Sequence, residues 1–300
     1  MFNKLICIES AGSLTEEALA LLNNYAREVV LHHDIPSTPE EVRARMEGAD
    51  AVLVSYTSRI DGWMLRECSP LLRYVGMTCS LYGPESANVD ILTARELGIT
   101  VTGCHAYGDR GVPEFLIHAL TSVLHGFRGW QWKDYPLEIT GQKVGVIGLG
   151  STGQLNARAL HFFGADLRYY DKFPKPELEA ELGIQPMAFD DLLGWADIIV
   201  SCLNTNIALM DTRAFSLFGD GKIYINTSIG PAHDLTALEA WLGRPGNFAI
   251  GDLQASLDAT GRLLERPNVL CAIKPSGMTT QARVRLGEIV LANIAAFLDA

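Results

Sequence analysis

Residues 143–153 read Lys-Val-Gly-Val-Ile-Gly-Leu-Gly-Ser-Thr-Gly, and this stretch constrains the fold more than any other part of the chain. An apolar segment, 144–147, leads into a turn that contains Gly148, Gly150 and Gly153. The first glycine permits a tight turn, the second lets backbone approach a pyrophosphate, and the third lets a following helix pack closely on the strand. The pattern predicts a strand, a turn and a helix whose N-terminus binds phosphate groups.

An acidic residue completes this pattern. Asp171 stands at the end of a second apolar stretch, 167–170, which is predicted to be the next strand. A carboxylate at that point accepts hydrogen bonds from an adenosine ribose and repels a 2′-phosphate. We therefore predict that the chain binds NAD in preference to NADP. A glycine-rich turn that holds no ligand is the alternative.

Short apolar stretches alternate with amphipathic ones along the chain, which is typical of βαβ units and a parallel sheet. We predict an α/β protein with two doubly wound parallel-sheet domains and a cleft between them. Residues 1–105 plus 282–300 would form a flavodoxin-like substrate domain, and residues 106–281 a Rossmann NAD-binding domain. The amphipathic segment 281–298 is predicted to return to the first domain.

Composition excludes several classes of partner. The net charge of −11 provides no basic surplus for nucleic acid or an anionic membrane. No apolar run approaches the length of a membrane span. The six cysteines are scattered without C-x-x-C spacing, which favours reduced thiols in a cytoplasmic protein. No spacing of His, Cys and Asp resembles a metal site, so no metal is predicted.

The order of these motifs resembles the D-isomer-specific 2-hydroxyacid dehydrogenase family over nearly the whole chain. The matching segments are Val112–Glu114, 148–153, 170–171, 196–198, 225–228 with Gly230 and Asp234, 251–252 and 268–270. The resemblance implies two α/β domains with NAD in the cleft, and reduction of 2-keto acids by hydride transfer. It implies cofactor contacts at Gly148, Gly150, Ser151, Thr152, Gly153, Asp171, Leu203, Thr227, Ser228 and Asp252, the last near the nicotinamide amide.

The catalytic positions depart from the family pattern. Ile229 stands where family members carry an arginine, Leu257 where they carry a glutamate, and Lys274 where they carry a histidine. Reduction of a keto acid needs a cation for the carboxylate, a proton donor and a polarising charge. Ile229 and Leu257 supply none of these. Residues 78–82, Thr-Cys-Ser-Leu-Tyr, replace a glycine-rich turn and are predicted to form a longer substrate loop.

Three residues are candidates for the missing catalytic groups. Lys274 follows the apolar stretch 269–272, at the strand end that borders the ligand crevice in open α/β sheets. Arg110 and Tyr107 lie on the predicted inter-domain loop, together with His105 and Asp109. The alternatives are a surface lysine and a solvated turn. His118 is predicted to be a core histidine rather than a cleft residue.

The sequence leaves three functions open. The first is an NAD-dependent oxidoreductase with an altered site for a carbonyl substrate, and the presence of Asp252 favours it. The second is a non-catalytic NAD(H)-binding sensor or scaffold. The third is an ordinary family dehydrogenase whose triad lies elsewhere, which the lack of any histidine after His233 disfavours. We also predict a homodimer, with Trp130-Gln131-Trp132 as aromatic interface surface or, alternatively, as part of the monomer's core.

Overall fold

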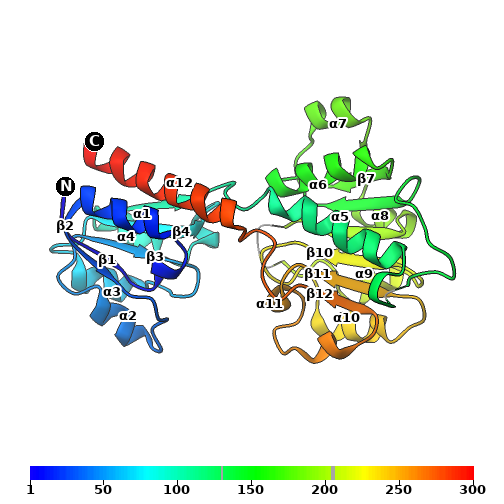
Figure 1. Ribbon diagram of the computed structural model, residues 1–300, viewed down its shortest axis with the longest axis horizontal. Coiled ribbons are helices and arrows are strands. Elements are labelled where there is room, and N and C mark those ends of the chain that lie inside the picture. Colours follow the sequence, from blue (N-terminus) through cyan, green and yellow to red (C-terminus); the bar gives the residue numbers. More distant parts are fainter. Residues whose placement is uncertain (130, 204–206) are drawn as a thin grey trace. The chain divides into compact units, whose positions relative to one another are not determined.

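The computed structural model describes residues 1–129, 131–203 and 207–300 (Figure 1). The chain divides into two compact units, residues 1–107 with 279–300, and residues 108–278. Each unit has its own parallel sheet with helices on both faces, so the predicted α/β class with two doubly wound sheets is confirmed. Trp130, part of the segment predicted to support pairing, lies outside the described residues.

The first unit holds a five-stranded sheet in the order β2-β1-β3-β4-β5, the flavodoxin-like order. Every pair of neighbouring strands is parallel. The strands are β1 Phe2–Cys7, β2 Ala26–Leu31, β3 Ala51–Val54, β4 Tyr74–Ser80 and β5 Thr100–Cys104. The helices are α1 Glu16–Leu21, α2 Pro39–Arg45, α3 Gly62–Cys68, α4 Ile91–Glu96 and α12 Thr280–Asp299, with 3₁₀ turns at Ser10–Gly12, Leu22–Asn24 and Pro84–Ser86.

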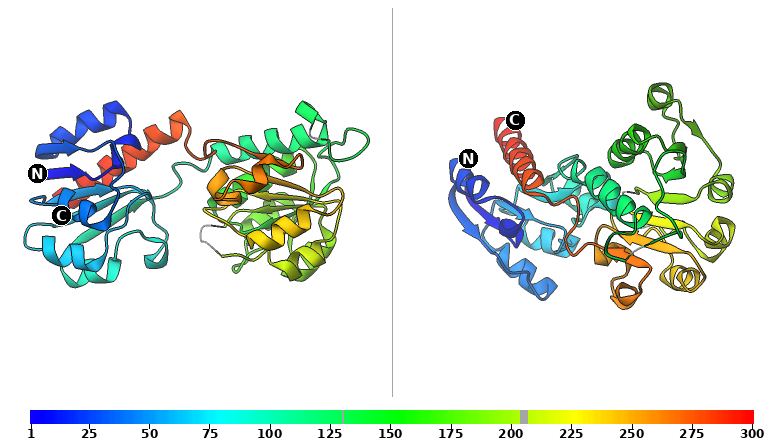
Figure 2. Two further views of the ribbon diagram at one scale, coloured as in Figure 1. Left: turned by 90° about the horizontal axis from the view of Figure 1, so that it is seen from below. Right: turned by 45° about the vertical axis from the view of Figure 1, so that its right-hand side comes forward.

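Helices α2, α3 and α4 cover one face of this sheet, and α1 and α12 cover the other (Figure 2). Side-chain caps fix several helix starts, because Thr15, Thr38 and Thr279 each accept a hydrogen bond from a first-turn N–H. The last helix of the chain thus packs on the N-terminal elements, as its amphipathic pattern predicted.

The predicted substrate loop at 78–82 is partly wrong. Strand β4 continues to Ser80 and pairs there with Cys104 of β5. Thr78 and Cys79 are buried, and Cys79 packs in the core against α2, α3 and α4. The polar residues were misleading because the end of a central parallel strand is covered on both faces. The loop therefore begins at Leu81.

The second unit holds a seven-stranded parallel sheet in the order β12-β11-β10-β9-β6-β7-β8. The strands are β6 Lys143–Ile147, β7 Asp166–Tyr170, β8 Gln185–Pro186, β9 Ile198–Ser201, β10 Ile223–Asn226, β11 Phe248–Gly251 and β12 Val269–Cys271. The helices are α5 Gly111–Leu124, α6 Ser151–Phe162, α7 Pro176–Leu182, α8 Phe189–Trp195, α9 Thr212–Phe218, α10 Leu235–Leu242 and α11 Gln254–Leu257, with 3₁₀ turns at Phe127–Gly129 and Arg262–Glu265.

Both faces of the second sheet are covered (Figure 1). Helices α5, α6 and α7 pack on one face, and α8, α9 and α10 pack on the other. Strand β6 lies between β7 and β9, so the strand order reverses at β6. Ligands of open α/β sheets bind at the carboxyl ends of the strands beside such a switch point. The glycine motif leaves β6 at that end.

Candidate functional site

The turn after β6 needs glycine for two different reasons. Gly148 has φ +88°, a left-handed conformation that disfavours side chains. A Cβ at Gly153 would clash with the Gly148 carbonyl oxygen, so α6 packs directly against the turn. A Cβ at Gly150 would meet nothing within 4 Å. The structure therefore leaves space at Gly150, the position where the motif expects a pyrophosphate to approach.

Helix α6 offers its first-turn N–H groups to a ligand. Its N-cap is Gly150, which has no side chain to accept a hydrogen bond from that turn. The first N–H groups of a helix lack intrahelical partners and attract anions together with the helix dipole. Ser151 and Thr152 are the first two residues of α6. The end of α6 thus fits a bound phosphate group.

Asp171 anchors the glycine turn as well as marking the ribose position. Its carboxylate accepts hydrogen bonds from the Leu149 N–H at 2.6 Å and the Phe173 N–H at 2.9 Å. A carboxylate offers about four acceptor positions, so positions remain for ribose hydroxyls. Lys175 Nζ lies 3.9 Å away and balances part of the charge. The residues of this half of the edge therefore fit an adenosine ribose and a pyrophosphate.

Asp109 has a structural link to the nucleotide loop that the sequence did not reveal. The Thr152 hydroxyl donates to Asp109 Oδ1 at 2.8 Å. The bond ties the segment before α5 to the first turn of α6. The hydroxyl of Thr152 is therefore already hydrogen-bonded within the protein, and its backbone N–H is the group that can bind a phosphate.

The loops after β9 and β10 join directly. The Leu203 N–H donates to Ser228 Oγ at 2.9 Å, and the Ile229 N–H donates to the Leu203 carbonyl at 2.9 Å. Thr227 is buried, and its hydroxyl donates to the Ser201 carbonyl at 3.0 Å. The structure thus brings Leu203, Thr227 and Ser228 together. The hydroxyl groups of Thr227 and Ser228 are hydrogen-bonded to the loop after β9 or to the end of that strand. A cofactor would therefore contact other atoms of these residues.

Asp252 is a buried carboxyl at the carboxyl end of β11. Its Oδ2 accepts from the Ser276 hydroxyl at 2.8 Å, and its Oδ1 accepts from the Ser256 hydroxyl at 3.3 Å. Burial raises the pKa of Asp252, although both serine hydrogen bonds act in the opposite direction. A carboxyl kept where its ionised form is disfavoured is a marker of function. Sequence reasoning found Asp252 but missed Ser276, which carries no motif.

The three positions predicted to replace the family triad, Ile229, Leu257 and Lys274, have different environments. Ile229 is 53% exposed, and Lys274 is exposed after β12. Leu257 is 1% exposed and packs in the core with α8, α9 and α10, while its carbonyl lies 2.8 Å from His233 Nε2. The side chain of Leu257 is therefore part of the core of the second unit. Ile229 alone of these two presents apolar surface.

The candidate catalytic residues belong to both units. Gly108 and Gly277 are in backbone contact, so the segments that carry Arg110 and Lys274 pass close to each other in the second unit. Arg110 is exposed at the start of α5. Tyr107 belongs to the first unit, where its ring packs against the core beside α1 and α12. Burial raises the pKa of Tyr107 to about 12, with the Ser80 hydrogen bond acting in the opposite direction.

His118 differs from its prediction. It lies within α5 and is exposed, so the expectation of a core histidine is wrong. The described residues contain no group of three or more His, Cys, Asp or Glu arranged to hold a metal ion. Nor does any helix in the described part of the chain have the length and apolar character to cross a membrane.

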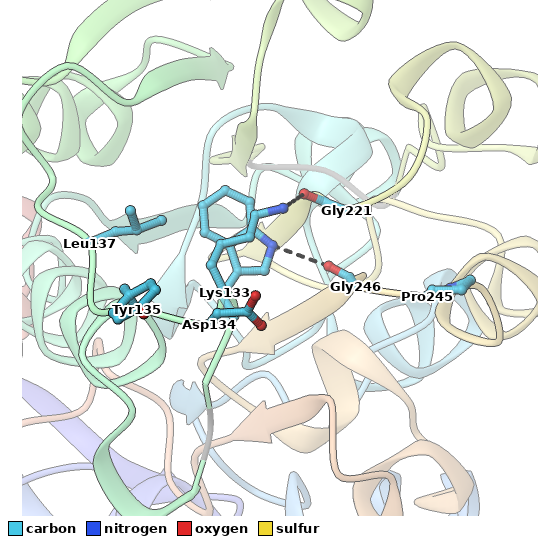
Figure 3. A pocket seen from close by; sticks show the side chains of 8 residues that line it. Lys133, Asp134, Tyr135, Leu137, Gly221, Pro245 and Gly246 are labelled. Carbon is cyan, nitrogen blue, oxygen red and sulfur yellow. Dashed lines mark hydrogen bonds between the residues drawn. The ribbon is translucent and has the colours of Figure 1, made fainter.

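A surface pocket of about 540 Å³ lies at the opposite edge of the second sheet (Figure 3). Its lining comes from segments that precede β6, β10 and β11, so it lies at the amino ends of the strands. Trp132 Nε1 donates to the Gly246 carbonyl and Lys133 Nζ to the Gly221 carbonyl, each at 3.1 Å. Trp132 is 7% exposed, so it is part of the unit's core rather than of a free aromatic surface.

Residues 118–272 match the family of the D-isomer specific 2-hydroxyacid dehydrogenase, NAD binding domain. The chain belongs to the D-isomer specific 2-hydroxyacid dehydrogenase family. Its second unit is therefore an NAD-binding domain, and the predicted cofactor is confirmed. The glycine turn, the start of α6 and Asp171 are the features of the structure that fit this cofactor.

Relatives of known activity resemble most of the chain. A hydroxypyruvate reductase from Blautia hydrogenotrophica is 28% identical over 286 residues, which cover 86% of this chain and 85% of that protein. A glyoxylate reductase from Thermococcus litoralis is 26% identical over 296 residues, which cover 90% and 87%. The apo-structure of D-lactate dehydrogenase from Escherichia coli has the same fold, with a TM-score of 0.79, 22% identity, and coverage of 99% and 97%.

Proposed function

We propose that this chain is an NAD(H)-dependent oxidoreductase that interconverts a carbonyl and a CH–OH group, with acid/base residues that differ from those of the family. One observation carries the proposal. Asp252 is buried, although burial raises its pKa and disfavours its ionised form, and it is hydrogen-bonded to Ser276. Ile229 and Lys274 are exposed at the positions where the resemblance places the family's arginine and histidine. A protein that bound only the adenosine half of the cofactor would gain nothing from such a carboxyl.

Each residue has a defined task in this proposal. The start of α6 binds the pyrophosphate, Asp171 binds the adenosine ribose, and Asp252 accepts from the nicotinamide amide. The bound cofactor supplies or accepts the hydride. Lys274 donates the proton that the carbonyl oxygen requires, or binds an anionic group of the substrate. Arg110 and Tyr107 assist, Arg110 as a second cation and Tyr107 as a neutral hydroxyl.

The proposal separates this chain from the keto-acid reductases that it resembles. Without a cation at position 229, a small 2-keto acid has lost its carboxylate anchor, and loss of a positioned acid/base alone costs roughly 10²–10⁴ in rate. We expect pyruvate and glyoxylate to be reduced far more slowly than an ordinary turnover of about 10 s⁻¹. NADH absorbance at saturating acid measures this. An ordinary turnover would instead support a standard family dehydrogenase.

Lys274→Met tests the proton donor once a substrate is found. We expect kcat/KM to fall by roughly 10²–10⁴ while NADH affinity is kept, because the lysine acts on the substrate. Lys143→Met is the matched control, since Lys143 is exposed at the amino end of β6. Unchanged kinetics in Lys274→Met would remove this residue from the mechanism.

A non-catalytic NAD(H) sensor or scaffold is the second candidate. The exposure of Lys274 favours it, as does that of Ile273 beside this lysine, which is 92% exposed. A broad panel of carbonyl compounds that gives no NADH oxidation, with NADH still bound, would support this candidate.

We also propose that the chain pairs as a homodimer through its NAD-binding domain and that it works in the cytoplasm. The six free cysteines suit a reducing compartment. The burial of Trp132 removes one argument for pairing, so family resemblance is what supports it. Light scattering at micromolar concentration distinguishes a dimer from a monomer.

A further inference from the structure

A concave site in the second unit lies away from the cofactor features. The surface pocket of about 540 Å³ in Figure 3 is lined by residues of this unit, and we call it the amino-edge pocket. Its lining segments precede β6, β10 and β11, whereas the glycine turn and Asp171 follow the carboxyl ends of β6 and β7. Its volume lies within the range of about 300–1,000 Å³ that is usual for small-molecule sites. A ligand here would therefore occupy a different site from NAD(H).

Lys133 brings a fixed positive charge into the amino-edge pocket. Its ammonium lies 4.4 Å from the centre of the Trp132 ring and donates a hydrogen bond to the Gly221 carbonyl at 3.1 Å. Trp132 is 7% exposed and donates to the Gly246 carbonyl, so the ring beneath the ammonium is held in place. A lysine ammonium has three N–H donors, and one hydrogen bond leaves two of them for a ligand.

Asp134, the next residue along the chain, adds a negative charge to the same pocket. Within the residues that the structure describes, neither Lys133 nor Asp134 forms an ion pair. The neighbouring loop differs, because there Arg244 pairs with Asp220 at 2.9 Å. Lys133 and Asp134 are both exposed, so the two charges of the pocket are available to a ligand that carries both signs.

The remaining side chains of the lining are mostly apolar. Tyr135 is 80% exposed, and Leu137 and Pro245 are the other apolar side chains of the pocket besides Trp132. An exposed aromatic ring gains from contact with another ring or with an aliphatic group. The amino-edge pocket thus combines one cation, one anion and an apolar surface.

We propose that the amino-edge pocket binds a free amino acid with an apolar or aromatic side chain. The Lys133 ammonium donates hydrogen bonds to the carboxylate of the ligand, Asp134 accepts from its ammonium group, and Tyr135 packs against its side chain. Charge-assisted hydrogen bonds of this kind are the strong ones. Because Lys133 is already held by protein contacts, it loses little freedom when the ligand binds.

The charges of the pocket favour a zwitterion over other small molecules. A nucleotide carries an excess of negative charge, which Asp134 would repel. A monocarboxylic acid leaves Asp134 without a partner and places a like charge near it, and a simple amine does the same at Lys133. A zwitterion has no net charge, so the net charge of −11 of the whole chain does not repel it.

Three probes with the same phenyl ring test the proposal in ligand-observed NMR titrations of the NADH-saturated protein. L-Phenylalanine carries both charges, 3-phenylpropionate lacks the ammonium group, and phenethylamine lacks the carboxylate. We expect L-phenylalanine to bind with a Kd on the order of 1 mM, and each of the other two to bind at least about tenfold more weakly. Saturation with NADH keeps the probes out of the cofactor site. Absence of L-phenylalanine binding up to about 20 mM would overturn the inference.

Two variants assign the charges to their partners. Lys133→Met should remove the advantage of L-phenylalanine over phenethylamine, and Asp134→Asn should remove its advantage over 3-phenylpropionate, each a change of about tenfold or more in the ratio of Kd values. Lys143→Met and Asp191→Asn are matched controls, because both residues are exposed in the second unit and neither lines the pocket.

The ratios distinguish recognition from a structural role. Equal losses of L-phenylalanine and phenethylamine in Lys133→Met would mean that the lysine only holds its loop, and wild-type ratios in both variants would mean that L-phenylalanine binds elsewhere. Either result overturns the inference. Neither affects the proposed oxidoreductase function, because no turnover is measured.

Discussion

The two halves of the carboxyl edge of the seven-stranded sheet are built differently. Around β6 and β7, the site consists of backbone: a glycine turn, a helix start and the carboxylate of Asp171 that fixes them. Around β10, β11 and β12, the candidate site depends on side chains: Asp252, which is buried and accepts a hydrogen bond from Ser276, the buried His233, and the exposed Ile229 and Lys274. The first half fits its ligand by shape, whereas the second needs particular functional groups.

This difference explains why the sequence identifies the ligand of the first half but not the chemistry of the second. A backbone site tolerates change at most positions but not at its glycines, so its glycine motif identifies the ligand. A side-chain site changes its chemistry when one residue changes, which is what we predict for Ile229 at the position of the family's arginine. Function resides in such sites rather than in the fold. The chain thus has the family's cofactor site, whereas the altered groups of its substrate site stay a prediction.

Replacement of Gly150 or Gly153 by alanine gives the largest expected effects. The two variants separate the stability of the turn after β6 from its affinity for NADH. We expect Gly150→Ala to keep wild-type stability, because its Cβ meets nothing within 4 Å, yet to weaken NADH binding by at least about 100-fold. We expect Gly153→Ala to lower the free energy of unfolding by about 1–3 kcal/mol, because its Cβ clashes with the Gly148 carbonyl.

Urea unfolding and calorimetric titration measure the two effects. Wild-type NADH affinity in Gly150→Ala would show that the pyrophosphate does not approach this glycine, and it would break the description of this half as a backbone site.

Asp171→Asn should have the next largest effect. Removing the charge weakens hydrogen bonds to a ribose and to the Leu149 N–H, and a charge-assisted hydrogen bond contributes roughly 1.5–3 kcal/mol. We expect NADH to bind roughly tenfold to 100-fold more weakly, and the preference over NADPH to shrink because the repulsion of a 2′-phosphate is lost. Asp191→Asn on α8 is the control. NADPH binding as tight as NADH binding in the wild-type protein would refute the preference.

The sequence predicted what local patterns determine. Alternation of apolar and amphipathic stretches indicated the strands and the two sheets, and the glycines with Asp171 indicated the cofactor, because their chemistry lies within a short stretch. The end of β4 was taken for a loop because residues 78–82 stand where the family has a glycine-rich turn, yet the strand continues to Ser80.

Contacts between distant residues could not be predicted. The Asp109–Thr152 and Asp252–Ser276 bonds join residues 43 and 24 positions apart, and serine or threonine in a loop gives no signal of its partner. Leu257 was placed in the site by its position in the family pattern, but the side chain packs inward. The hydrogen bond from Arg285 of α12 to the Tyr107 carbonyl joins residues 178 positions apart.

Asp252→Asn tests whether the buried carboxyl of Asp252 lowers the stability of the folded protein while it strengthens NADH binding. Because burial raises the pKa of Asp252, the carboxyl stabilises the folded state below its unfolded pKa and loses that contribution as pH rises through the folded value. We therefore expect Asp252→Asn to raise the thermal midpoint at pH 7.5 and to lose this gain toward acid pH. NADH should bind about tenfold more weakly through loss of one charge-assisted hydrogen bond. A lower midpoint at pH 7.5 would contradict this account.

His233, a buried residue of the second half, gives the smallest expected effect, which is on the pH dependence of stability. Its Nδ1 lies 3.2 Å from the Tyr224 hydroxyl and its Nε2 lies 2.8 Å from the Leu257 carbonyl, and burial lowers its pKa. A histidine with a lowered folded pKa contributes stability that is fully present above the unfolded value of about 6.5 and is lost as pH falls toward the folded value. The free energy of unfolding of the wild-type protein should therefore decrease between pH 7.5 and pH 5.

His233→Gln removes the titrating imidazole but keeps a side-chain amide that can form one of the two hydrogen bonds of His233. We expect it to lower the free energy of unfolding at pH 7.5 by about 1–3 kcal/mol, because buried hydrogen bonds are lost, and to make the decrease toward pH 5 shallower. His118→Gln is the control, since that histidine is exposed on α5 and should leave both the stability and its pH dependence unchanged. Urea unfolding at the two pH values measures the slopes. An equally steep decrease in His233→Gln would mean that groups other than this histidine set the acid sensitivity of the fold.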